Sequence, residues 1–244
     1  MSRNFYISIF AAIGLLCAIS APAHAVPFSP GDFLNHTQND WGDVAQPEQL
    51  VTTNYDTVYA PFGVFQIGIT NGSGFSITFG DAASLLAYLP ALGPAGTLNS
   101  NLFDPTTSAS GKFGGEAAAL RLNVDFSDAN LLAHLPGVPF GNLKLTGFSG
   151  SLAGLNEMPV RDFLGVINNA LGGGLAPYTI SDLDNVAVQL NAAFFGGIPL
   201  DWAETHLELP GTTAPVPEPA TLLLFGIGLA GLAARVAWRN RGRT

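Results

Sequence analysis

Two short runs of β-branched and aromatic residues in the first half of the chain predict a β-hairpin. They lie in APFGVFQIGITNGSGFSITFG, residues 60–80, on either side of Asn71-Gly72-Ser73-Gly74. Glycine and asparagine readily adopt the positive φ angles that a tight turn between two strands requires. Asp81 then stands where an N-cap is expected, and it predicts a short helix over residues 82–89 that ends before Pro90.

Helical periodicity is clearest in the second half of the chain. In residues 158–174 the apolar positions fall on one helical face, with Pro159 in the first turn and Gly172 at the C-terminal cap; these positions are Val160, Phe163, Leu164, Ile167 and Leu171. A second helix is expected in residues 180–197, with Ser181 and Asp184 as an S-x-x-D capping box and Gly196 as its stop. Residues 200–209 predict one more short helix.

The remaining segments give weaker patterns. Residues 26–59 are rich in Asn, Gln, Asp and Pro and predict irregular chain, residues 90–115 predict a loop, and residues 140–150 predict a short strand. Residues 115–132 are ambiguous, because four apolar positions alternate as in a strand whereas the Glu-Ala-Ala-Ala start favours a helix, which we prefer. The fold class expected for residues 26–211 is therefore α+β, with a hairpin in the first half and packed helices in the second.

The start of the chain has the features of a secretory signal peptide. Arg3 precedes an apolar run over residues 7–19, and Ala23-His24-Ala25 supplies the small-x-small pattern read by signal peptidase. We therefore expect residues 1–25 to be removed and the mature chain to begin at Val26. The single cysteine, Cys17, falls inside this segment, so the mature chain would contain neither a disulfide nor a catalytic thiol.

The closing segment predicts a membrane span. Residues 220–234 carry no charge, and a helix over residues 220–238 would be about 28 Å long, close to the thickness of a bilayer's hydrocarbon core. By the positive-inside rule, the basic tail of residues 239–244 would lie in the cytoplasm; the arginines of this end are Arg235, Arg239, Arg241 and Arg243. GIGLAG at residues 226–231 matches a dinucleotide fingerprint, but it lacks the strand and downstream acid which that site needs, so no cofactor is expected.

Pro217-Glu218-Pro219 ends a proline-containing linker of residues 212–219 directly before this apolar run. The order of Pro-Glu-Pro, apolar helix and basic tail resembles the PEP-CTERM sorting signal of Gram-negative bacteria. The resemblance implies processing by an exosortase, a temporary membrane anchor and delivery to the cell surface or outside the cell. GKFGGEAAALRLNVDFSDA and LNEMPVRDFLGVINNALGGG, within residues 33–208, also resemble a recurring exported bacterial domain of no assigned activity.

Charge excludes nucleic acid as a partner. The chain has 18 acidic and 9 basic residues and a net charge of −9, and all the acidic residues lie between Asp32 and Glu218. That stretch contains few cations, namely Lys112, Arg121, Lys144 and Arg161. Because the exported domain is so acidic, we expect it to be repelled by nucleic acid and by anionic lipid.

Catalytic motifs are missing from the predicted mature chain. Its histidines are His36, His134 and His206, and they belong to no H-E-x-x-H, while no G-x-S-x-G or phosphate-binding loop occurs. Ser149 is expected in a polar loop, and a calcium loop counted from Asp182 lacks its required glycine and final carboxylate, so no metal-binding residue is predicted. Calcium held by scattered Asp and Asn oxygens of another loop stays an open alternative. Two further sets remain open: the acid pairs Asp125/Asp128 and Asp201/Glu204, and aromatic rings for sugar stacking or the core, which are Trp41, Tyr55, Tyr59 and Trp202.

These patterns predict a non-enzymatic exported protein that acts at the cell surface or in the extracellular matrix, with exopolysaccharide as a candidate partner. One alternative is a secreted hydrolase whose active-site residues are distant in sequence, since triads need not be neighbours along the chain. Another is a permanently anchored periplasmic protein whose C-terminal helix is never removed.

Overall fold

The structure, a computed structural model, describes residues 28–60, 64–69 and 72–211. The predicted signal peptide with its cleavage site, and the predicted linker, span and basic tail of residues 212–244, lie outside these residues. Within the described part of the chain, no helix has the length and apolar character needed to cross a bilayer. Residues 27–210 form one compact unit.

Two helices occupy the segment that was expected to be irregular. They are α2 (Gln38–Asp43) and α3 (Ala45–Tyr59). Thr37 caps α2 through a capping box, in which its hydroxyl accepts from the Asp40 amide and the Asp40 carboxylate accepts from the Thr37 amide. The prediction of irregular chain was wrong because this T-x-x-D pattern, and buried side chains every fourth residue in α3 (Val51, Tyr55, Tyr59), outweigh the polar composition.

The predicted hairpin is confirmed. β1 (Phe65–Gly68) and β2 (Ser76–Phe79) pair antiparallel, with Phe65 opposite Phe79. The segment predicted as loop contains a third strand, β3 (Leu102–Phe103), which pairs parallel to β2 and gives the order β1-β2-β3. A second small sheet joins β4 (Lys144–Leu145), within the predicted strand region, to β5 (Leu207–Glu208).

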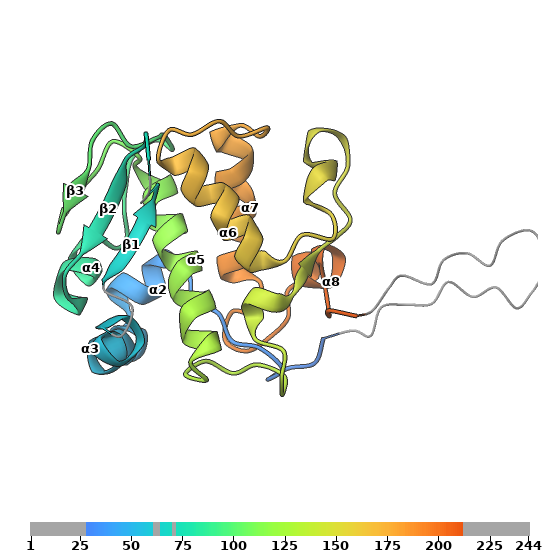
Figure 1. Ribbon diagram of the computed structural model, residues 1–244. Helices are drawn as coiled ribbons and strands as arrows, with labels where there is room; N and C mark the ends of the chain where they lie inside the picture. The colour runs from blue at the N-terminus through green and yellow to red at the C-terminus, as the bar shows by residue number, and fades with distance from the viewer. Residues whose placement is uncertain (1–27, 61–63, 70–71, 212–244) are drawn as a thin grey trace, which may run out of the picture. The chain divides into compact units, whose positions relative to one another are not determined.

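Helix α5 (Lys112–Asp128) lies between the three-stranded sheet and the later helices (Figure 1). It contains most of the ambiguous segment, residues 115–132, for which the helical interpretation is confirmed, and it begins three residues earlier, in the segment predicted as loop. Its apolar residues do not follow a helical period because the helix is buried nearly all round, and the four that alternate are themselves all buried: Leu120, Leu122, Val124 and Phe126. A helix that exposes so few of its side chains has no clear amphipathic pattern.

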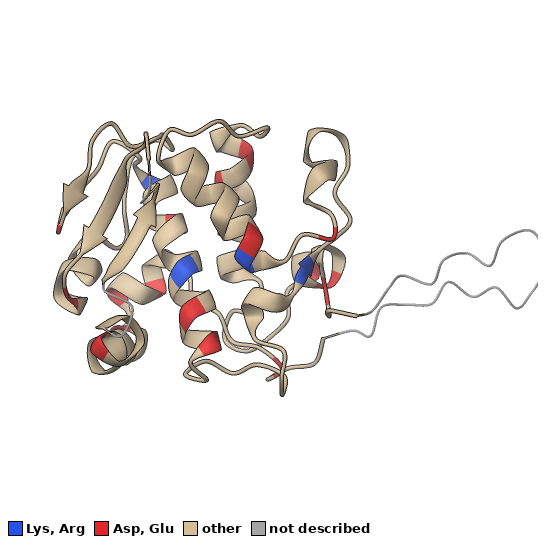
Figure 2. Cartoon of the chain, viewed as in Figure 1, with Lys and Arg blue, Asp and Glu red and all other residues tan. Residues whose placement is uncertain are grey.

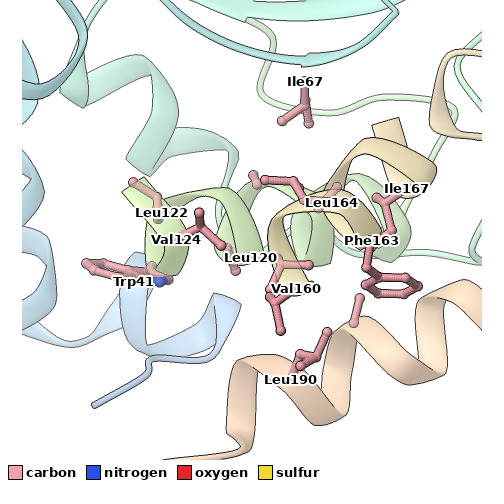
Figure 3. Packing of buried hydrophobic residues seen from close by; sticks show 14 of the residues in the cluster. Trp41, Ile67, Leu120, Leu122, Val124, Val160, Phe163, Leu164, Ile167 and Leu190 are labelled. Atoms are coloured by element: carbon pink, nitrogen blue, oxygen red, sulfur yellow. The ribbon is translucent and has the colours of Figure 1, made fainter. Parts of the chain in front are cut away.

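The remaining helices are α4 (Ala82–Tyr88), capped by Asp81 as predicted, α6 (Val160–Leu171), α7 (Ile180–Ala192) and α8 (Asp201–His206), with short 3₁₀ turns η2 (Phe140–Asn142) and η3 (Gly150–Leu155). Of these helices, α6 and α7 pack against α5. The predicted apolar face of α6 is buried, and Gly172 is its C-cap. Figure 3 shows side chains of α5, α6 and α7, such as Leu120, Phe163 and Leu190, in one apolar cluster.

Helix α7 begins differently from the prediction. Thr179, rather than Ser181, is the N-cap, and its hydroxyl accepts from the Asp182 amide at 3.1 Å. Asp184 belongs to no capping box, because it is buried and pairs with Lys112 from α5. The helix ends at Ala192, before Gly196.

Replacing Thr179 with alanine is therefore expected to lower the free energy of unfolding by about 1 kcal/mol, because a helix amide loses its acceptor. Ser181→Ala serves as the matched control and should change stability by less than about 0.5 kcal/mol, since its side chain caps nothing. Urea unfolding of the two variants measures both values. A larger loss of stability in the Ser181 variant would mean that Ser181, as predicted from the sequence, is the N-cap of α7.

Candidate functional site

Each basic side chain of the described residues is paired with a carboxylate. The pairs are Lys112–Asp184 (2.6 Å), Arg121–Asp125 (3.0 Å), Lys144–Glu157 (2.9 Å) and Arg161–Asp128 (3.0 Å). Figure 2 shows the four cations in blue, spread over the fold rather than gathered on one face. Between residues 28 and 211, the described cations therefore form no basic patch that would attract a nucleic acid or another polyanion.

Three elements meet around a buried carboxylate on α5. Glu116, 6% exposed, accepts from Gln38 Nε2 of α2 and from Asn191 Nδ2 of α7, each at 2.7 Å. Asn191 also accepts, through Oδ1, from Asn123 Nδ2 at 3.0 Å, and Asn123 in turn pairs with the backbone of His36 at 2.8 and 2.9 Å. We call Gln38, Glu116, Asn123 and Asn191 the polar network.

Burial raises the pKa of Glu116, and the hydrogen bonds from Asn191 and Gln38 oppose this rise. No member of the polar network was predicted from the sequence as a buried polar residue. Glutamate and asparagine in a helix ordinarily face water, and their partners here are 68 to 87 residues away along the chain. The one available signal was the lack of a polar face on α5. The network's contacts join helices to one another, which is a structural role.

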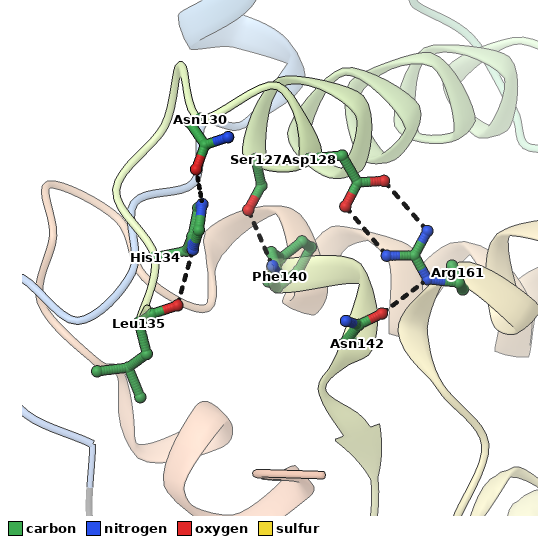
Figure 4. Close-up of polar contacts among 8 residues, drawn as sticks. All are labelled: Ser127, Asp128, Asn130, His134, Leu135, Phe140, Asn142 and Arg161. Atoms are coloured by element: carbon green, nitrogen blue, oxygen red, sulfur yellow. Dashed lines mark hydrogen bonds and ion pairs between the residues drawn. The ribbon is translucent and has the colours of Figure 1, made fainter. Parts of the chain in front are cut away.

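The three candidate histidines lie in separate environments. The His36 ring packs against Trp41 at 4.8 Å, and burial lowers its pKa while Asp40 opposes that shift. His134 places its ring nitrogens near Leu135 O and Asn130 Oδ1 (Figure 4), whereas His206 stacks on Trp202. In the part of the chain that the structure describes, no histidine side chain hydrogen-bonds to a serine or carboxylate, and no three potential metal ligands gather.

Ser149 and the acid pairs do not converge with these histidines either. Ser149 is the N-cap residue of η3, without a side-chain cap bond. Asp125 pairs with Arg121, whereas Asp128 pairs with Arg161. The Arg161 guanidinium donates to the two carboxylate oxygens of Asp128 at 3.0 and 3.1 Å and to Asn142 Oδ1 at 3.0 Å (Figure 4). Burial raises the pKa of Asp125, with Arg121 opposing. Asp201 and Glu204 are exposed on α8.

The four candidate aromatic residues divide into core and surface. Trp41, Tyr55 and Tyr59 are at most 4% exposed and belong to the core. Trp202, by contrast, is only partly buried, stacks nearly parallel on His206 with centroids 4.9 Å apart, and meets the edge of Phe148. We call Phe148, Trp202 and His206 the α8 aromatic group. It is the one place where a predicted sugar-stacking ring keeps an accessible surface.

Comparison with known proteins finds a known sorting motif near the C-terminal end of the sequence. Residues 215–241 match the model of the PEP-CTERM protein-sorting motif. The match covers Pro217, Glu218 and Pro219 and three of the four predicted arginines, with Arg243 just beyond it; the roles of the individual residues stay predictions. No curated protein and no solved structure matches the chain, and the resemblance of its central domain to an exported bacterial domain stays a prediction too.

The motif supports export, processing by an exosortase, and a final place at the cell surface or outside the cell. The chemistry of the described domain adds no catalytic constellation to this. What the comparisons show is thus the sorting signal: residues 215–241 of this chain carry the PEP-CTERM protein-sorting motif.

Proposed function

We propose that this chain is a non-enzymatic exported protein of the cell surface or extracellular matrix. The observation that carries the proposal is a sorting motif at residues 215–241 joined to a domain in which several of the candidate catalytic groups make structural contacts. The ring nitrogens of His134 hydrogen-bond to nearby residues of its own loop, and Asp125 and Asp128 pair with arginines. A hydrolase would need a nucleophile, a base and an acid within reach of one another, whereas among the described residues no histidine side chain hydrogen-bonds to a serine or a carboxylate.

Extracellular polysaccharide is the partner that we propose for the domain. The α8 aromatic group supports this, since aromatic rings with one accessible side and a polar edge suit ligands that are partly apolar and partly wet. The acidic surface also favours a neutral partner over a polyanion. The C-terminal helix would act as a transient anchor, held in the bilayer until the exosortase removes it.

The intact mass of the mature protein in its host tests the proposal. We expect the species outside the cell to begin at Val26 and to lack everything beyond the Pro-Glu-Pro region, because the motif directs processing there. Membrane and extracellular fractions should be measured separately. A single species of residues 26–244 confined to the membrane would contradict the proposal and would make the C-terminal helix a permanent anchor.

A further inference from the structure

The loop between α7 and α8 exposes an unusual amount of apolar surface. Within residues 193–200, which we call the apolar loop, Phe195 is 51% exposed, Ile198 57% and Leu200 40%. No charged residue occurs in the loop. The other large hydrophobic residues exposed in the described chain stand singly in separate segments, as on most protein surfaces.

The loop is built to keep these side chains outside. Gly31 donates its amide to Gly197 O at 2.8 Å, which fixes the middle of the loop, and Leu200 donates to Ala193 O at 3.0 Å, which joins its two ends. Phe194 points inward and packs against Phe28, with ring centroids 5.1 Å apart. Because Phe194 is buried, its neighbour Phe195 is left facing solvent.

Connectivity of the chain indicates what could cover this loop. Only α8 and β5 separate Leu200 from Pro210, and the sorting motif begins at residue 215. Residues 211–219 reach at most about 30 Å when fully extended. While the predicted span of residues 220–238 is in the bilayer, the end of the domain is therefore kept within that reach of a lipid surface.

We propose that the apolar loop inserts into the interfacial layer of the membrane while the C-terminal helix anchors the protein. Phe195, Ile198 and Leu200 would enter among the lipids, and exposed Asp201, directly after them, would remain in water and keep the insertion shallow. The contact holds the domain beside the bilayer until processing frees it. This inference rests on the transient anchoring in the proposed function.

A fluorescent probe at the loop tests the inference in the full chain. Cys17→Ser leaves no cysteine, so Ile198→Cys can carry one nitrobenzoxadiazole label. Leu175→Cys is the matched control, since Leu175 is 99% exposed and precedes α7 whereas Ile198 follows it. In vesicles of phosphatidylethanolamine and phosphatidylcholine, which carry no net charge to repel the acidic domain, we expect the label at 198 to shift to the blue and to lose intensity when doxyl lipid is added.

The label at 175 should keep the emission that it has in buffer, and both variants should unfold at the same urea concentration as the unlabelled chain. If the chain floats with the vesicles but the label at 198 behaves as the label at 175 does, the loop does not touch lipid and the inference is wrong. If the chain does not float at all, the anchoring itself is wrong and the inference is lost with it.

Discussion

Replacing Asn191 with leucine is expected to lower the free energy of unfolding by about 3 kcal/mol at neutral pH, because a buried carboxylate loses one of its two side-chain donors. Asn191 is fully buried and donates to Glu116 Oε2 at 2.7 Å. The same change removes the acceptor of Asn123 Nδ2. Urea unfolding measures the loss.

Asn185→Leu is the matched control, since Asn185 is exposed on the same helix. It should change stability by less than about 0.5 kcal/mol. Equal effects in the two variants would contradict an energetic role for the polar network.

The size of this loss should depend on pH. Burial already raises the pKa of Glu116, and the bond from Asn191 opposes that rise, so losing Asn191 raises the pKa further. A carboxyl whose pKa is raised by folding stabilises the fold fully below its unfolded pKa, and this contribution disappears as the pH rises through the folded pKa. The gap between Asn191→Leu and the parent chain should therefore shrink as the pH falls from about 7 toward about 4. A gap that is independent of pH would mean that the lost stability does not involve the charge on Glu116.

Changing Pro217, Glu218 and Pro219 together to alanine is expected to abolish processing. Two prolines fix an extended, non-helical backbone before the predicted span, whereas three alanines would let a helix continue into the linker. The processing enzyme would then meet no extended segment next to the membrane. We expect a species of residues 26–244 to accumulate in the membrane fraction, with the extracellular form lost.

The matched control for this change is Thr212→Ala with Thr213→Ala, which alters the linker outside residues 215–241. The control should be released as the parent chain is, and intact mass of each cell fraction shows both results. Normal release of the Pro-Glu-Pro variant would mean that the three residues do not direct processing.

The sequence by itself determined those features of this protein that depend on neighbouring residues. Asn71–Gly74 between two β-branched runs predicted the hairpin, Asp81 predicted the cap of α4, and the spacing of Phe163 and Ile167 predicted the buried face of α6. The sorting motif is likewise read from consecutive residues. Turn chemistry, caps, amphipathic periods and linear signals act over a few positions, so they need no knowledge of the fold.

Only the tertiary structure decided what surrounds α5 and how its polar groups are satisfied. A helix buried on nearly every side shows no clear polar stripe, which left its type ambiguous in the sequence. Glu116 and Asn191 are buried together although 75 residues separate them, and Asp184 pairs with Lys112 rather than capping α7. A polar side chain can be buried at low cost only where hydrogen-bonding or oppositely charged groups lie beside it. Only the folding of the chain brings groups so distant in sequence together.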